Sequence, residues 1–195
     1  MKSFNILSLL LSVLFLGVVS CEDSSEVGEY DNWKERNMAF IDSIASVARA
    51  DSDGKWKIFS VTGLDENKVW ANDVYVYCNI LQAGGGTEHP AFNDTIELYY
   101  RGRLIPSKSY PKGYVFDSSY DGELEPEFDP TTKMLLNNTV PGFYTAIQHM
   151  VKGDAWRVYI PATLGYGATE KTGIPAYSDL IFDINLISFS HVEKK

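Results

Sequence analysis

The residues that most often carry out chemistry are few and scattered in this sequence. Its three histidines, His89, His149 and His191, have no helical spacing and no Cys-x-x-Cys partner, which disfavours a zinc site. Residues 117–122 imitate the start of a calcium loop, but the position that needs a bidentate glutamate is Phe128. There is no Gly-x-Ser-x-Gly motif and no credible Cys–His pair. The sequence therefore offers no metal site and no activated nucleophile.

The most informative stretch is an aromatic strand–loop–strand at residues 157–189. Its loop contains Ile-Pro, Tyr-Gly and Ile-Pro in turn, which is typical of a long ordered loop rather than a hairpin. The stretch presents apolar surface around one tyrosine, Tyr166, with no acid, base or nucleophile arranged for catalysis. Its final strand alternates strictly and puts on one face Leu180, Phe182, Ile184 and Leu186.

The elements around this stretch indicate an α+β fold. Strands are predicted at residues 74–82 and 94–104, and a short strand ends at Ser119, whereas residues 55–72 are ambiguous. A helix is predicted over 137–151, with Thr139 as N-cap, Pro141 in the first turn and Gly153 as its stop. We expect a curved antiparallel sheet with this one helix across a face. Cys78, in the first of these strands, is interpreted as a small buried core residue.

An additional helix is predicted at the N-terminal side, over residues 31–50, with Asp31 or Asn32 as its cap. Its apolar residues recur at near-helical spacing and must be buried. We expect them to pack on the following domain. The alternative is that this helix pairs with a second copy and forms a homodimer.

Four phrases, taken together in order and spacing, resemble the FKBP-type peptidyl-prolyl isomerases. The resemblance covers about residues 73–189 and implies an FKBP-like fold, a curved antiparallel sheet wrapped around one short helix. The phrases are DTIELYYRG, VFDSS, TVPGFYTAIQHMVKGDAWRVYIPATLGYG and IPAYSDLIFDINLI.

The resemblance also implies a set of site residues around a proline-binding cavity. Tyr166, Asp117 and Phe182 are expected to be catalytic, with the Tyr166 hydroxyl facing a substrate carbonyl. The backbone N–H of Val140 is expected to meet a substrate carbonyl as well. The remaining residues expected to bind substrate are Tyr100, Phe116, Phe128, Val140, Phe143 and Ile174.

The activity that the resemblance implies needs no cofactor, metal or nucleophile. Rotation about an Xaa-Pro bond passes over a barrier of about 18–20 kcal/mol, through a twisted state that has lost its resonance. The planar amide is more charge-separated than the twisted one, so water stabilises the planar form more. An apolar cavity removes this extra stabilisation of the planar form. A donor placed for the rotated carbonyl stabilises only the twisted form. The alternative is a binding module or chaperone that holds proline-containing partners without turnover.

The sequence departs from the family pattern at several positions. Phe143 stands where the family usually has a tryptophan, and Lys171 replaces a frequent histidine. The loops at residues 105–115 and 119–139 are longer than the family's compact versions. A basic partner for Asp117 is not evident, and Asp117 read alone is also compatible with an ordinary turn residue. These departures bear on substrate preference.

The N-terminus predicts export and a lipid anchor. A lysine precedes an apolar run from Ile6 to Val19, which is shorter than the ~20 residues of a membrane-spanning helix. Val18-Val19-Ser20-Cys21 resembles the lipobox of bacterial lipoproteins, in which Cys21 would be lipidated. The alternatives are a plain secretory signal and an uncleaved anchor. This predicts a location in the bacterial cell envelope, at the periplasmic face or the cell surface.

The net charge and the order of the segments predict the partners and the domain organisation. The formal net charge is −9, which argues against nucleic acid and anionic lipid surfaces as partners. The expected partners are therefore Xaa-Pro-containing polypeptides. We predict a signal peptide at residues 1–20, a tether and helix region at 21–72, and an isomerase domain at 73–195.

Overall fold

The computed structural model describes residues 28–61, 64, 68 and 70–191. The signal-peptide and Cys21 predictions lie outside these residues. In the described part of the chain, no helix is both long enough and apolar enough to span a membrane. The elements, in chain order, are α1 (Trp33–Arg49), β1 (Trp56–Ser60), η1 (Asn72–Val74), β2 (Tyr75–Gln82), β3 (Thr95–Arg103), β4 (Val115–Ser118), β5 (Thr132–Leu135), η2 (Leu136–Asn138), α2 (Pro141–Ile147), β6 (Ala155–Ile160), η3 (Ala162–Leu164) and β7 (Leu180–Ser190).

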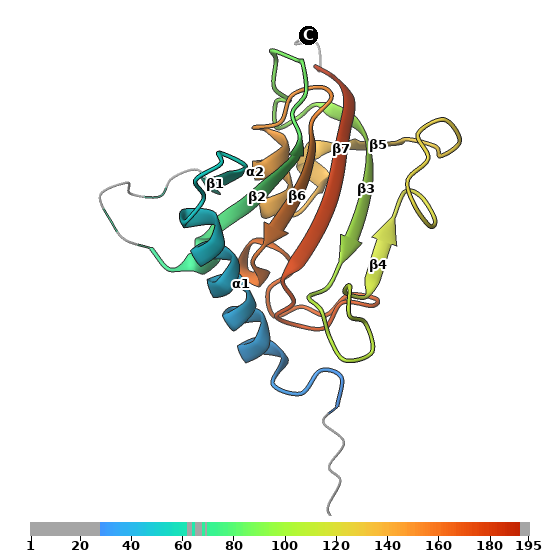
Figure 1. Ribbon diagram of the computed structural model, residues 1–195. Coiled ribbons are helices and arrows are strands. Elements are labelled where there is room, and N and C mark those ends of the chain that lie inside the picture. Colours follow the sequence, from blue (N-terminus) through green and yellow to red (C-terminus); the bar gives the residue numbers. More distant parts are fainter. Residues whose placement is uncertain (1–27, 62–63, 65–67, 69, 192–195) are drawn as a thin grey trace, which may run out of the picture.

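The strands form one antiparallel sheet in the order β1-β2-β6-β7-β3-β4, with β5 paired to β3 (Figure 1). β7 is central and is held between β6 and β3 over most of its length. The face of β7 that was predicted to be apolar is buried: Leu180, Ile184 and Leu186 are fully buried and Phe182 is 8% exposed. The expected α+β fold with a curved antiparallel sheet is confirmed.

The two helices cover opposite faces of the sheet (Figure 1). α2 packs into the main core with Val76, Cys78 and Val158, which point to one face of β2 and β6. α1 packs on the other face, where Ile41 and Ala45 meet Tyr77 and Tyr159, which point the opposite way. Cys78 is fully buried, as predicted, and burial raises the pKa of its thiol.

Two buried hydrogen bonds fix α1 to the loop that precedes β7. The Trp33 indole donates to Ser178 Oγ at 2.8 Å, and the Asp179 backbone N–H donates to Asn37 Oδ1 at 2.7 Å. The helix therefore packs within its own chain, as expected, and dimerisation through it stays a prediction. β1 pairs with β2, so the sheet begins before residue 73.

Several local predictions are wrong. α2 is seven residues long and its N-cap is Val140, without a side-chain cap, because the Thr139 hydroxyl donates to the Leu136 carbonyl instead. The chain leaves the helix after Ile147, well before Gly153. The strand β5 and the 3-10 turn η2 occupy residues that were expected to be loop and helix start.

Asn32, one of the two residues predicted as the N-cap of α1, does occupy that position, but its side chain does not cap the helix. Asn32 adopts a left-handed conformation with φ 50° and makes no capping hydrogen bond. The Asp31 carboxylate accepts the Gly28 N–H at 2.7 Å, so it closes the preceding turn rather than the helix. The first-turn N–H groups of α1 therefore have no side-chain cap, and the helix depends on its packing and its bonds to the 175–179 loop.

Candidate functional site

A cavity of about 470 Å³ opens on the side of the sheet that α2 covers. Strands β3, β4 and β7 form one wall, the turn from η2 into α2 forms another, and the loop after η3 contributes Tyr166. The cavity is mainly aromatic and aliphatic, with a few polar groups at its edge. Its lining residues are Tyr100, Asp117, Met134, Asn138, Thr139, Val140, Pro141, Phe143, Tyr166 and Phe182.

Phe182 lies at the centre of this aromatic wall. Its ring packs edge-to-face against Phe143 and Phe116, with centroids 5.0 and 5.5 Å apart, and tilted against Tyr100 at 6.4 Å. Aromatic pairs prefer such edge-to-face contacts, because the ring edge is positive and the ring face is negative. The four rings come from β3, β4, α2 and β7, so the tertiary fold, and not local sequence, assembles the cavity wall.

Gly102 of β3 allows the rings to pack this closely. A Cβ at this position would lie 2.5 Å from the Phe116 ring and 2.8 Å from the Phe182 ring, distances that real Cβ atoms do not reach. The absence of a side chain is thus a requirement of the cavity wall.

Tyr100 and Asp117 form the main polar contact of the site. The Tyr100 hydroxyl donates a 2.8 Å hydrogen bond to Asp117 Oδ2. Burial, and then this hydrogen bond, raise the pKa of Tyr100 far above its ordinary value, so the phenol stays protonated. Among the described residues Asp117 forms no ion pair. The Tyr100 hydroxyl therefore donates its proton to Asp117 in a hydrogen bond and is not free to donate to a ligand.

Two hydrogen-bond donors at the cavity have no partner in the described part of the chain. The Tyr166 hydroxyl makes no hydrogen bond there, and its side chain is 37% exposed, with Lys171 Nζ 5.6 Å from the ring centroid. The backbone N–H of Val140, just before α2, is likewise unpaired, although the Val140 carbonyl accepts the N–H groups of Phe143 and Tyr144. Both donors are available to a bound ligand.

Most of the residues expected at the site come together. Tyr100, Asp117, Val140, Phe143, Tyr166 and Phe182 line the cavity. Phe116 lies behind the lining through its contact with Phe182. Ile174 is buried in the adjacent core, and its backbone pairs with Lys171 to close the loop beside Tyr166.

Phe128 is not brought to the cavity, and its expected placement is wrong. It is 79% exposed, on the loop between β4 and β5. The Glu125 carbonyl accepts the Phe128 and Asp129 N–H groups, and the Tyr99 hydroxyl donates to the Pro126 carbonyl at 3.1 Å. Tyr99 and Tyr100 are consecutive on β3 and point to opposite faces, so this loop is attached to the face away from the cavity.

The structure adds lining residues that sequence reasoning missed. Met134 comes from the unpredicted strand β5, and Asn138, Thr139 and Pro141 come from η2 and the start of α2. The sequence pattern identifies Pro141 only as a helix-start residue. Val140 is the extended residue just before a short helix, and Pro141 follows it at the first helical position. This pair could have indicated an exposed N–H at Val140. Met134 carries no such signal, because β5 pairs with a strand almost forty positions earlier.

No cluster of three or more potential metal ligands occurs within the residues that the structure describes. The site instead combines apolar rings, a phenol–carboxylate pair at its edge and two unpaired donors. Such an arrangement can hold an apolar ring and hydrogen-bond carbonyl oxygens beside it.

Comparison with known proteins agrees with this geometry. The sequence profile of the family described as FKBP-type peptidyl-prolyl cis-trans isomerase matches residues 86–187, slightly more than half of the chain. The macrophage infectivity potentiator of Trypanosoma cruzi is 42% identical over 106 residues, covering 54% of this chain and 48% of that protein. The peptidyl-prolyl cis-trans isomerase Mip of Coxiella burnetii is 37% identical over 117 residues, covering 60% and 44%. This chain thus spans about half the length of the curated relatives it matches.

A solved structure shares the fold. The crystal structure of a peptidyl-prolyl cis-trans isomerase from Pseudomonas syringae superposes with a TM-score of 0.56 at 23% identity, covering 81% of this chain and 96% of that one. At this level of identity the likeness concerns the fold. With the matched profile and the assembled cavity, it leads to one conclusion: this chain belongs to the FKBP-type peptidyl-prolyl cis-trans isomerase family.

Proposed function

We propose that this protein catalyses cis–trans rotation about Xaa-Pro bonds, with the prolyl ring held in the aromatic cavity. The observation that carries the proposal is the position of Phe182, 8% exposed at the centre of three other rings, beside two unpaired donors. A prolyl ring is apolar and has no N–H, so it fits a pocket without hydrogen-bonding walls.

The apolar walls supply the first part of the catalysis. The uncatalysed rotation takes tens to hundreds of seconds, because the planar amide is stabilised by resonance. Water adds to that stability, since the planar form has the larger charge separation. Transfer of the Xaa-Pro amide from water to the cavity formed by Phe143 and Phe182 removes this contribution and lowers the barrier.

The donors supply the second part. As the bond rotates, the carbonyl of the residue before proline turns out of the amide plane. A donor that meets this carbonyl only in the rotated position stabilises the transition state over the ground state. We assign this role to the Tyr166 hydroxyl and assign the Val140 N–H to holding a neighbouring substrate carbonyl. Asp117 acts by orienting Tyr100, whose ring forms part of the wall.

The test is an isomerisation assay with an Ala-Leu-Pro-Phe-type peptide and the chain from residue 22 onwards, which retains every described residue. We expect catalysed exchange for the wild type, a strong loss for Phe182→Ala and a partial loss for Tyr166→Phe. Tyr177→Phe is the matched control, because Tyr177 is an exposed tyrosine eleven positions further along the same loop and outside the cavity lining. A wild-type rate equal to the uncatalysed rate, together with measurable peptide binding, would support the binding-module or chaperone alternative instead.

We further propose that the protein is lipidated at Cys21 and acts on polypeptides of the bacterial cell envelope. The support is the apolar run ending in the lipobox-like Val18–Cys21, followed by acidic, small residues suited to a tether. Cys21→Ser should release the protein from the membrane fraction. A variant that stays in the membrane would contradict lipidation, and an active but soluble variant would separate the anchor from the catalysis.

A further inference from the structure

α1 covers only part of the sheet face on which it packs. α1 packs on residues of β1, β2 and β6 and does not extend over β7 and β3 (Figure 1). A groove of about 500 Å³ lies between the helix and this surface. Its walls combine apolar and basic side chains, chiefly Phe40, Ile44, Arg103, Lys112, Arg157 and Ile181.

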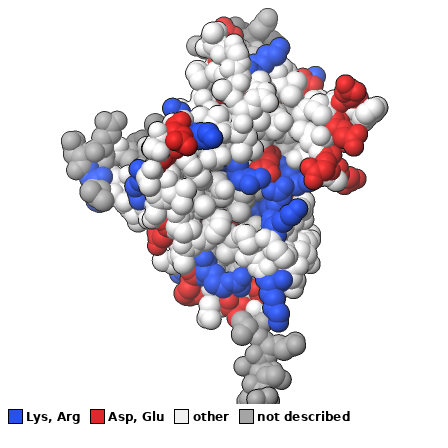
Figure 2. All heavy atoms as spheres, viewed as in Figure 1, with Lys and Arg blue, Asp and Glu red and all other residues white. Residues whose placement is uncertain are grey.

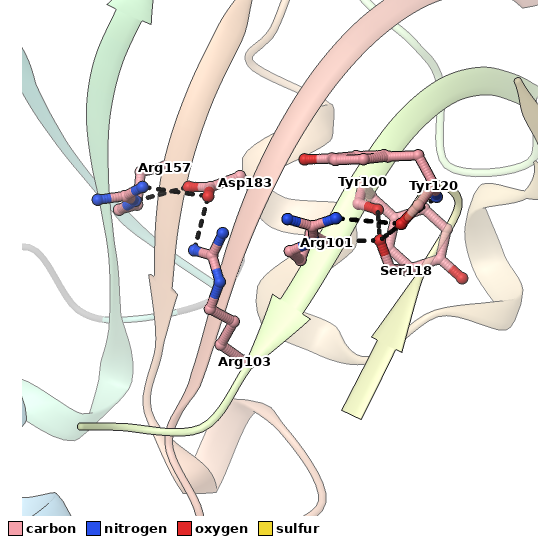
Figure 3. Close-up of polar contacts among 7 residues, drawn as sticks. All are labelled: Tyr100, Arg101, Arg103, Ser118, Tyr120, Arg157 and Asp183. Atoms are coloured by element: carbon pink, nitrogen blue, oxygen red, sulfur yellow. Dashed lines mark hydrogen bonds and ion pairs between the residues drawn. The ribbon is translucent and has the colours of Figure 1, made fainter. Parts of the chain in front are cut away.

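The groove is positively charged. Asp183 of β7 lies between two arginines (Figure 3): Arg103 Nη1 contacts its Oδ2 at 2.7 Å, and Arg157 Nε contacts its Oδ1 at 2.5 Å. Burial alone would raise the pKa of Asp183, but these two guanidinium groups hold it below its ordinary value. Two cations thus share one carboxylate, and Lys112 adds a further charge at the rim. This basic patch contrasts with the net charge of −9 for the whole chain.

The loop between β4 and β5 has the opposite character. Residues 121–129, DGELEPEFD, contain five acidic and no basic residues. Phe128 in this loop is 79% exposed, the most exposed large apolar side chain in the described part of the chain. The loop is nevertheless ordered, since Glu125 N–H donates to Asp129 Oδ2 at 2.7 Å and Tyr99 holds the Pro126 carbonyl. An ordered loop loses little conformational entropy when it binds.

Both features lie on one face of the molecule. Figure 2 shows basic side chains gathered in the middle of this face and acidic side chains gathered on the projecting loop at its right. The Tyr99 contact attaches the loop to the same side of the sheet as Asp183, because both side chains point away from the cavity. The groove and the hollow formed by the loop have no lining residue in common, so they are two separate surfaces.

We propose that the loop 121–129 of one copy docks in the groove of a second copy. The acidic side chains would meet Arg103, Arg157 and Lys112, and the Phe128 ring would cover Phe40 and Ile44. Because loop and groove share a face, a two-fold axis brings both loops into both grooves at once. Two reciprocal contacts then close a dimer, and no open filament forms.

Sedimentation of the chain from residue 22 onwards tests this directly. We expect a concentration-dependent rise in weight-average mass toward that of a dimer at low salt. Raising the salt from about 50 to about 500 mM should reverse it, because screening weakens exposed charge pairs. Sedimentation as a monomer at every concentration in low salt would overturn the proposal.

Two charge reversals make the test specific. Lys112→Glu in the groove and Glu127→Lys in the loop should each weaken self-association about tenfold or more, because like charges then face each other twice. An equimolar mixture of the two variants should associate as the wild type does, since each contact again pairs opposite charges. Both side chains are exposed, so folding is not at risk.

The matched control is Lys57→Glu, the same charge change at an exposed position of β1 outside the groove, which should leave association unchanged. Phe128→Ser should weaken association without any charge change. A dimer that tolerates both single reversals, or a mixture that fails to restore association, would show that another surface is used.

Discussion

Replacing Tyr166 by phenylalanine removes one oxygen from the cavity and little else. Within the described residues the Tyr166 hydroxyl has no hydrogen-bond partner, and the side chain is 37% exposed. The substitution therefore breaks no contact of the folded protein, and we expect the free energy of unfolding to change by less than about 0.5 kcal/mol.

The expected effect on catalysis follows from one neutral hydrogen bond. Such a bond contributes about 0.5–1.5 kcal/mol net, which corresponds to a rate change of about 2- to 12-fold. Because the hydroxyl is assigned to the rotated carbonyl alone, both kcat and kcat/KM should fall by this factor while KM stays nearly constant.

Kinetics of wild type, Tyr166→Phe and the Tyr177→Phe control, with thermal unfolding measured in parallel, would decide the matter. Full activity in a correctly folded Tyr166→Phe variant would refute the assigned role. A raised KM with unchanged kcat would also refute it, because the hydroxyl would then bind the ground state and the transition state equally.

Three further predictions concern the scaffold. Gly102→Ala places a methyl group against the Phe116 and Phe182 rings, so we expect a loss of about 1–3 kcal/mol in urea unfolding and a higher KM for peptide. Trp33→Phe removes the indole donor to Ser178, and unfolding should show a loss of roughly 1–2 kcal/mol; an unchanged stability would mean that this bond does not fasten α1. Burial raises the pKa of Asp179 to about 8. Between about pH 4 and pH 8 the folded protein therefore keeps a proton that the unfolded chain has lost. Because of this group, the free energy of unfolding falls as the pH rises through that range. Asp179→Asn should therefore gain stability relative to wild type on going from pH 5 to pH 8, and a constant difference between the two proteins would contradict this.

The sequence alone predicts the elements whose pattern is local and regular. The alternation in β7 identifies its buried face, and Cys78 is buried as its strand context indicates. Strand β5 escapes prediction because it is four residues long and is defined by its pairing with β3. The end of α2 is missed as well, because after Ile147 the N–H groups of His149 and Met150 bond to carbonyls only three residues back, a change that helical periodicity does not reveal.

The candidate site was predictable where the sequence resembles its family and not where the chain has its own loop. The aromatic residues on β3, β4, α2 and β7 converge because the sheet register brings them together. Phe128 falls on the lengthened β4–β5 loop, whose internal turn and bond to Tyr99 point it away from the cavity. The groove next to α1 was also not predictable, because its basic residues come from different strands and become neighbours only through Asp183.

We propose that this cavity catalyses rotation about Xaa-Pro bonds and does not merely bind them. Exchange NMR on a proline-containing peptide, with the protein at catalytic concentration, measures the cis and trans interconversion directly. The proposal predicts an exchange rate that rises in proportion to protein concentration and returns to the uncatalysed value with Phe182→Ala. Peptide resonances that shift on binding while the exchange rate stays at its uncatalysed value would contradict it.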